Sequence, residues 1–142
     1  MKDYNKIIRE NSTIESTRLI LRPFSIKDVE DVFLYASDEI VTKYLTWPPH
    51  TDISQTKKIV KEFFMDKPGV FAIELKSERK CIGCIELRIY TEHDKASFGY
   101  VLNRKYWNKG YMTEALKRII DFAFSKLGLN RIEATHYVGN EG

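Results

Sequence analysis

The residues best suited to chemistry lie where a basic loop, Asn103–Lys109, runs into the start of a helix. The first turn of a helix leaves several backbone N–H groups without intrahelical acceptors, at the positive end of the helix dipole. Gly110 lets a bulky anion approach the backbone closely, and the Thr113 hydroxyl can donate one more hydrogen bond. Together these features indicate a pyrophosphate site. An ordinary helix start after a basic loop is the alternative, because neither a GxGxxG nor a P-loop pattern is present.

Two cysteines form a second candidate site, because Cys81 and Cys84 have the spacing of a CxxC motif. A redox CxxC places its first thiol at a helix N-terminus, where the dipole lowers the thiol pKa. Here the flanking residues, Lys80 and Ile85–Ile89, alternate as in a strand. A zinc site needs about four ligands, and the chain has no second pair of cysteines. We therefore expect two small, buried strand residues and no bound metal.

Hydrophobic periodicity predicts one strand and two helices in the first half of the chain. The strand covers Thr17–Phe24. Ser25 with Asp28 resembles a capping box that starts the first helix, and Asp52 with Gln55 caps the second. The apolar stripe expected to bury the second helix consists of Ile53, Thr56, Ile59, Val60 and Phe63.

In the second half the period changes to two after Pro68 and Gly69. The three strands of an antiparallel meander are expected at Val70–Lys76, Cys81–Tyr90 and Ala96–Leu102. The longest helix begins near Lys109 or Gly110 and ends at Gly128, and a last strand covers Arg131–Tyr137. The order β-α-α-β-β-β-α-β predicts an α/β fold with a mixed α+β sheet.

Size and composition exclude several classes of protein. With 142 residues, 43% hydrophobic and 30% charged, the chain is expected to form one domain over residues 15–142, after an N-terminal extension over residues 1–14. A net charge of +3 without a basic face does not favour nucleic-acid binding. No apolar run approaches the roughly 18 residues of a membrane span. Charges within Met1–Glu10, where a signal peptide would be apolar, favour a cytoplasmic location.

Two stretches around the predicted helix start are similar to a known family. Gly99–Leu102, followed by Tyr106–Leu116, resembles the acetyl-CoA motif of the GNAT superfamily of N-acetyltransferases. The resemblance is strongest to the branch with the RimJ/RimL-type enzymes, which acetylate the N-termini of ribosomal proteins. Thr17–Arg22 also matches the opening strand of that branch, and Asn130–Ala134 its fifth strand. The resemblance implies a GNAT fold from about Glu15 to the end of the chain.

The resemblance also implies acetyl-CoA as cosubstrate and gives roles to individual residues. The fourth strand of the family, here Ala96–Leu102, separates from the fifth, and pantetheine enters the gap. Backbone groups of Tyr100, Val101 and Leu102 would bond the pantetheine amides and polarise the thioester carbonyl. The pyrophosphate would be held by the backbone of Asn108, Lys109, Gly110, Tyr111, Met112 and Thr113. Asn140 matches an asparagine that lies near pantetheine in relatives.

Two residues depart from the pattern of the branch. Asn108 stands where glycine is usual, and asparagine tolerates the left-handed backbone conformation better than most residues. Met112 stands where alanine or glycine is usual. Its longer side chain either crowds the phosphates or turns into the core.

The catalytic groups are left open by the resemblance. Acetyl transfer needs a neutral amine, hence a base or a water chain, and a donor for the departing thiolate. Relatives often have glutamate at the position of Ser97, whose hydroxyl can position a water but is a poor base. Glu86 and His136 are the other candidates, with His93 behind them. An ion pair of Glu86 with Arg88, and a histidine that lies in a strand without a role, are the alternatives.

The chain ends where the branch normally continues with another helix and a β-hairpin. We therefore expect a domain that is truncated at its C-terminus, with an unpaired edge on strand Arg131–Tyr137. Such an edge predicts self-association, as a homodimer or a larger assembly.

The sequence therefore predicts an enzyme that transfers acetyl from acetyl-CoA to a primary amine. A protein N-terminus is the favoured acceptor, followed by a polyamine or an aminoglycoside, and Trp47, Pro48 and the first two helices would shape the acceptor side. The alternative is a non-catalytic or weakly active remnant that binds CoA or self-associates, which Ser97 and the early chain end favour. An RNA-binding module would need a basic patch that the sequence lacks.

Overall fold

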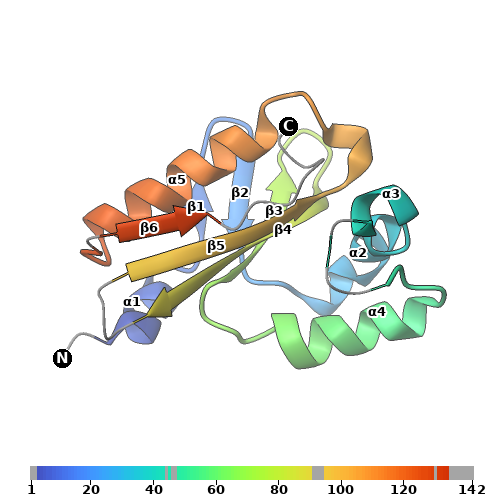
Figure 1. Cartoon of the computed structure of the whole chain (residues 1–142), viewed down its shortest axis with the longest axis horizontal. Coiled ribbons are helices and arrows are strands. Elements are labelled where there is room, and N and C mark those ends of the chain that lie inside the picture. Colours follow the sequence, from blue (N-terminus) through green and yellow to red (C-terminus); the bar gives the residue numbers. More distant parts are fainter. Residues whose placement is uncertain (1–2, 44, 46–47, 91–94, 130, 135–142) are drawn as a thin grey trace.

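The fold is built around one six-stranded sheet (Figure 1). The computed structural model describes residues 3–43, 45, 48–90, 95–129 and 131–134. The strands are β1 (Ile14–Glu15), β2 (Leu19–Arg22), β3 (Val70–Leu75), β4 (Lys80–Tyr90), β5 (Lys95–Leu102) and β6 (Arg131–Ala134). They lie side by side in the order of the chain, antiparallel from β1 to β5, while β5 and β6 are parallel. A parallel pair needs a crossover connection, which a helix supplies here.

The helices precede or connect these strands in the sequence. They are α1 (Tyr4–Glu10), α2 (Val29–Ala36), α3 (Glu39–Thr42), α4 (Ile53–Ile59) and α5 (Tyr111–Ser125). A 3₁₀ turn, Ile26–Asp28, leads into α2, and a π-helical turn, Val60–Phe64, extends α4. Figure 1 shows α5, the crossover, running beside β6, with α2, α3 and α4 grouped at the other end of the molecule.

The two faces of the sheet carry separate apolar clusters, because side chains alternate along each strand. Phe71, Ile85 and Phe98 lie on the face that packs against α1 and α5. The opposite face presents smaller side chains, such as Ala72 and Cys84, to α2 and to the turn after α4. The elements that could form a site are therefore divided between two layers, and β5 contributes to both.

Most of the predicted elements are confirmed, and the capping boxes explain why. The Ser25 side chain accepts a hydrogen bond from the backbone at the start of the 3₁₀ turn, and the Asp28 carboxylate accepts one from the Ser25 N–H. Asp52 and Gln55 form the same reciprocal pair at the start of α4. These local contacts satisfy backbone donors that would otherwise be left unpaired, so they can be read from the sequence.

Other features differ from the prediction. Residues 4–10, expected within an extension, form α1, and its Tyr4 and Ile8 are buried in the main core. The short helix α3 was not expected. Phe63, expected in the buried stripe of the second helix, is 58% exposed. It lies in the π-helical turn, where Met65 N–H bonds Val60 C=O at 2.8 Å, and the wider turn rotates Phe63 out of the buried stripe.

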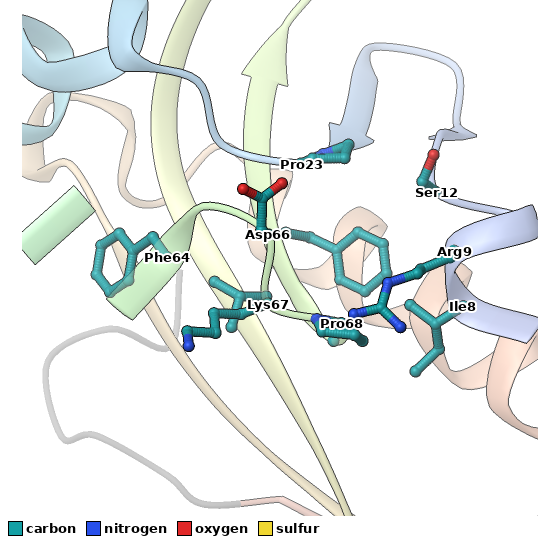
Figure 2. Close-up of a pocket in the computed structure, with 11 residues that line it drawn as sticks. Ile8, Arg9, Ser12, Pro23, Phe64, Asp66, Lys67 and Pro68 are labelled. Atoms are coloured by element: carbon teal, nitrogen blue, oxygen red, sulfur yellow. The ribbon is translucent and has the colours of Figure 1, made fainter. Parts of the chain in front are cut away.

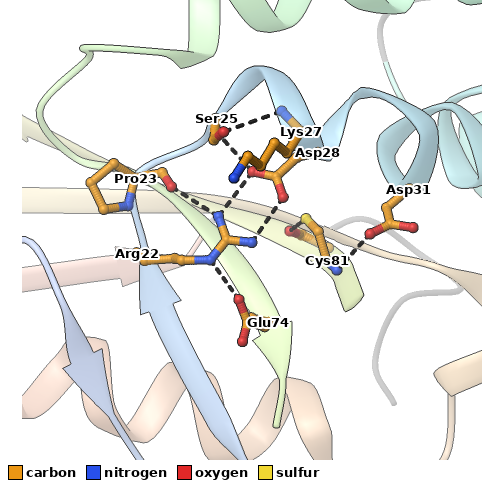
Figure 3. Close-up of polar contacts among 9 residues, drawn as sticks. Arg22, Pro23, Ser25, Lys27, Asp28, Asp31, Glu74 and Cys81 are labelled. Carbon is orange, nitrogen blue, oxygen red and sulfur yellow. Dashed lines mark hydrogen bonds and ion pairs between the residues drawn. The ribbon is translucent and has the colours of Figure 1, made fainter. Parts of the chain in front are cut away.

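An ionic cluster joins β2, β3 and the start of α2 (Figure 3). The Arg22 guanidinium donates two hydrogen bonds to Asp28, at 2.8 and 2.9 Å, and a third to Glu74 at 2.8 Å. The Asp28 side chain is only 6% exposed. Bidentate pairing of this kind fixes the orientation of both partners, so the cluster sets where α2 lies over the sheet.

No helix in the described part of the chain is long and apolar enough to cross a membrane.

Candidate active site

Helix α5 begins without a side-chain cap. Its N-cap residue is Gly110, and the first intrahelical bond runs from Glu114 N–H to Gly110 C=O at 3.0 Å. By contrast, Asp3, Asp38 and Asp52 cap α1, α3 and α4. The helix therefore directs the N–H groups of its first turn, Tyr111–Thr113, outward with no side chain accepting from them at the cap. An anion placed there would receive these bonds at the positive end of the dipole.

The loop before α5 depends on two left-handed residues. Asn108 has φ +62° and Gly110 has φ +80°, on either side of the exposed Lys109. Glycine adopts this conformation without strain, and asparagine is among the residues that tolerate it best. The unusual Asn108 is thus compatible with the turn. Met112 is 2% exposed and packs in the main core, so its side chain turns away from the helix start.

The Glu114 side chain links the start of α5 to the turn between β1 and β2. Its carboxylate accepts from Ser16 Oγ at 2.5 Å, from Arg18 N–H at 2.8 Å and from Arg18 Nε at 2.7 Å. Burial raises the pKa of Glu114, but the hydrogen bonds from Ser16 and Arg18 outweigh it and leave the pKa below its ordinary value. The carboxylate is therefore ionised at neutral pH and serves as an acceptor only.

Arg18 is a site residue that the sequence prediction missed. Its guanidinium donates to Lys109 C=O at 3.1 Å and lies over the Tyr111 ring, 4.4 Å from the centroid. It brings a positive charge to the helix start from a distant part of the sequence. The only signal for it was its place in the opening strand motif, Thr17–Arg22. Arg104, by contrast, pairs with Asp38 at 3.0 Å.

The backbone of β5 beside this loop has a defined orientation. Asn103 N–H bonds Ile82 C=O at 2.7 Å, and the register of β4 and β5 is regular from Gly83–Leu102 to Tyr90–Lys95. In an antiparallel ladder this phase turns the backbone groups of Gly99 and Val101 toward β4, and those of Tyr100 and Leu102 toward β6. The Leu102 C=O accepts from the Trp107 indole at 2.8 Å. Within the described residues, pairing of β5 with β6 ends at Phe98–Ala134.

A close approach of β4 holds the end of β5 in place. A Cβ on Gly83 would lie 2.4 Å from the Val101 carbonyl oxygen. Only glycine fits at that distance, because backbone atoms cannot move aside as a flexible side chain can. Val101 can therefore lie this close to β4 only because Gly83 has no side chain.

The candidate catalytic residues Ser97 and Glu86 share one face of the sheet. Glu86 is the cross-strand partner of Gly99, and Ser97 is the partner of Arg88. Glu86 forms an ion pair with Arg88, which is the alternative to a catalytic role that the sequence left open. Ser97 is 7% exposed, and its hydroxyl lies 3.4 Å from the Tyr90 hydroxyl. His93, His136 and Asn140 lie outside the described residues, as does Trp47.

Of two adjoining cavities, the first opens on this face and the second extends from it to the face that packs against α1. One, of about 320 Å³, lies between α2, α4 with its π-helical turn, and β5. The other is a wider cleft of about 680 Å³, bordered by α1, Lys67, Glu86 and Arg88. Phe63 lines both. The first cavity reaches β5 at Val101, whereas the described residues that line the second belong to other elements, with Glu86 across from Gly99 of β5.

A third cavity, of about 250 Å³, lies away from β5. Figure 2 shows Ile8 and Arg9 of α1 on one side of its wall, with Asp66, Lys67 and Pro68 toward the middle of the view. None of its described wall residues belongs to β5 or α5, and none is a candidate catalytic residue, whereas Glu86 borders the wide cleft. We assign it no part in the chemistry of the site.

The two cysteines are buried strand residues, as predicted. Cys81 and Cys84 lie in β4, are free thiols and pack beneath α2. Burial raises the pKa of Cys81 to about 12, so its thiolate is not populated at neutral pH. No group of three or more potential metal ligands occurs among the residues that the structure describes.

Replacing Glu114 tests how the helix start is held. At neutral pH, Glu114→Gln is expected to lower the free energy of unfolding by about 1–2 kcal/mol, because hydrogen bonds to a charged acceptor are lost. The folded pKa lies below the unfolded value, so this stability is present above about pH 5 and is lost as the pH falls through the folded pKa. Urea unfolding should therefore show a difference from wild type at about pH 7 that fades by about pH 3.

Glu15→Gln is the matched control, since the Glu15 side chain is 63% exposed in its pair with Lys76. It should change stability by no more than about 0.5 kcal/mol at either pH. A gap between wild type and Glu114→Gln that stays constant with pH would contradict the assigned role.

The sequence and the fold were compared with those of known proteins. Residues 18–142 match the acetyltransferase (GNAT) domain family. The uncharacterized N-acetyltransferase p20 of Bacillus licheniformis is 36% identical over 127 residues, which cover 86% of this chain and 71% of that protein. A crystal structure of a GNAT-family acetyltransferase from Bacillus anthracis has 33% identity and a TM-score of 0.80, and covers 90% of this chain and 75% of its own. YdaF of Bacillus subtilis, provisionally named a ribosomal N-acetyltransferase, is 40% identical over 47 residues, 33% of this chain and 26% of YdaF.

The family match covers most of the sheet and all of α5, and the fold agrees with the relative of known structure. Members of this family use acetyl-CoA. The chain belongs to the GNAT family and is an N-acetyltransferase.

Proposed function

We propose that this N-acetyltransferase acetylates protein N-termini, with acetyl-CoA bound at the start of α5 and along β5. The observation that carries the proposal is the uncapped start of the longest helix, which follows β5 through a short loop. A pyrophosphate would be held there by the N–H groups of Tyr111–Thr113, with the Arg18 guanidinium beside the helix start and the exposed Lys109 next to Gly110. Acetyl-CoA supplies the acetyl group as an activated thioester.

Pantetheine would lie along the side of β5 that faces away from β4. Tyr100 and Leu102 turn their backbone groups to that side, so they are the residues that we propose to bond it. Val101 turns its backbone toward β4, so its predicted role narrows to its side chain, which lines the apolar cavity. The predicted role of Asn140 stays a prediction, because this residue lies outside the described part of the chain.

Glu86 is the base that we propose for deprotonating the acceptor amine. Its carboxylate borders the wide cleft, lies across from Gly99 of β5 and pairs with Arg88. Ser97 lies on the same face and can position a water, as its hydroxyl is already in contact with Tyr90. His136 remains a further candidate that these residues do not test.

The choice of acceptor rests on two similarities. The motifs of the strand, loop and helix resemble the RimJ/RimL-type branch, and the provisional name of YdaF describes it as a ribosomal N-acetyltransferase. Its similarity covers only 33% of this chain. We propose a protein N-terminus as the acceptor, in preference to a polyamine or an aminoglycoside.

The rival function is a protein that binds acetyl-CoA without turnover. Ser97 favours it, since a serine hydroxyl is a poor base at the position where relatives often have glutamate. The two functions share the acetyl-CoA site and differ in whether Glu86 can act on an amine.

A further proposal concerns self-association. Self-association rests on β6, which stands last in the strand order, so that one of its edges has no strand partner among the described residues. Light scattering at micromolar concentration tests this, and a monomer would contradict it.

Calorimetric titration with acetyl-CoA, followed by a thiol-release assay, tests the proposed function. The wild-type chain should bind acetyl-CoA and release thiol when an N-terminal peptide is added. Lys109→Glu should weaken binding about tenfold, because it places a negative charge beside the diphosphate. Lys117→Glu, a charge reversal at an exposed lysine further along α5, is the control and should bind like wild type.

The possible results separate the two functions. Binding with thiol release supports the proposed enzyme. Binding without release from any amine supports the rival. If acetyl-CoA does not bind, or if both lysine variants weaken binding equally, the assigned site is wrong.

A further inference from the structure

The cavity beside Val101 has almost entirely apolar walls. Val32 and Ala36 of α2 form one side, and Ile59 and Phe64 form the other. Its volume of about 320 Å³ places it at the small end of ligand pockets, with room for one bulky side chain rather than a cofactor. A charged group that entered it would lose its hydration without meeting an opposite charge.

The two polar residues in these walls are electrically neutral at pH 7. His50 Nδ1 lies 2.7 Å from the hydroxyl of the buried Thr56, and burial lowers the pKa of His50 below its ordinary value. Tyr35 is buried, and burial raises its pKa well above the ordinary value, so its hydroxyl keeps its proton. None of the described residues that line the cavity carries a charge.

The cavity lies close to where we place the reaction. Val101 contributes its side chain to the wall, and Gly99, two residues earlier on the same face of β5, lies across from Glu86. A group attached to the carbon that bears the acceptor amine could therefore enter the cavity while the amine stays near Glu86.

The neighbouring cleft has the opposite character. It is about twice as large, and Asp3, Lys67, Glu86 and Arg88 place both signs of charge around it. Phe63, which lines both cavities, marks the border between them. A ligand that fills both sites needs an uncharged apolar end and a polar chain that continues from it. A peptide with an apolar first residue has this form, whereas a polyamine or an aminoglycoside has charges along its whole length.

We infer that the acceptor is a polypeptide whose first residue has a bulky, uncharged apolar side chain, and that this side chain occupies the cavity between α2, α4 and β5. This inference rests on the proposed function and makes it narrower. The amine lies near Glu86, and the following residues run across Phe63 into the charged cleft. Polyamines and aminoglycosides are excluded as good acceptors, because no described residue of the cavity can compensate their charge.

A charge at the border tests the inference with little risk to folding. Phe63 is 58% exposed, so Phe63→Glu should leave the core intact while placing a carboxylate beside the cavity. Phe124→Glu is the matched control, since Phe124 is 50% exposed on α5, which packs on the opposite face of the sheet. Peptides that differ only in the first residue, leucine, phenylalanine, serine, lysine or aspartate, are compared in the thiol-release assay, with spermidine as a further acceptor.

A second measurement does not depend on turnover. The same peptides, carrying a fluorescent label at the C-terminus, are titrated with each variant in the absence of acetyl-CoA. Wild type and Phe124→Glu should prefer leucine or phenylalanine over lysine about tenfold or more, in kcat/KM and in affinity. Phe63→Glu should reduce this preference about tenfold.

The outcomes separate the inference from the function on which it rests. Equal use of all first residues, a preference for spermidine, or an unchanged preference in Phe63→Glu would overturn the inference and leave the acetyltransferase assignment standing. Binding with the expected preference but without acetyl transfer would support the cavity and overturn the proposed function. If no peptide binds and none is acetylated, both the inference and the proposed function are contradicted.

Discussion

The geometry of the site depends on how the first turn of α5 is held while its N–H groups stay available. A side-chain cap would hold a helix start, but it would also occupy the donors that an anion needs. Here the restraint comes from the carboxylate of Glu114, which lies within the helix and bonds Ser16 and Arg18 from the segment before β2. The helix is thus fixed to the sheet from its side. Gly110 and Asn108, both with positive φ, then bring the loop in close to the helix end.

The division of the sheet into two faces explains how one strand can serve both substrates. The edge of β5 that faces away from β4 leads to the start of α5, where the cosubstrate is proposed to lie. The face of β5 that carries Ser97, Gly99 and Val101 lies toward α2 and the cavities. Gly83 permits the close contact that positions this part of β5. The two substrates would therefore meet at β5 from different directions, so that the amine can approach the face of the thioester carbonyl.

Features that depend on local chemistry could be predicted from the sequence. The capping boxes of Ser25 and Asp52, the strands with period two, and the buried CxxC follow from neighbouring residues. The left-handed conformation of Asn108 also follows, since few other residues tolerate it. Features that depend on distant contacts could not be predicted. Arg18 contacts the helix start although it is separated from Lys109 by 91 positions in the sequence. The direction of the Met112 side chain is set by the packing of the core.

Phe63 illustrates a different limit. A regular helical period places it in a buried stripe, but the π-helical turn adds a residue to that turn and brings it to the surface. No residue type in Val60–Phe64 predicts such a turn. The acceptor side of the site, which depends on this residue, is therefore less predictable than the cosubstrate side, where the motif residues are contiguous.

The most direct test of the account is an NMR titration of the ¹⁵N-labelled chain with acetyl-CoA. The account predicts that the amide resonances of Tyr111, Met112 and Thr113 shift most, together with those of Tyr100 and Leu102, because their N–H groups would contact the ligand. The amides of α4 should change little. Largest shifts in α2 or α4, or no shifts at about 1 mM acetyl-CoA, would contradict the claim that the uncapped start of α5 binds the cosubstrate.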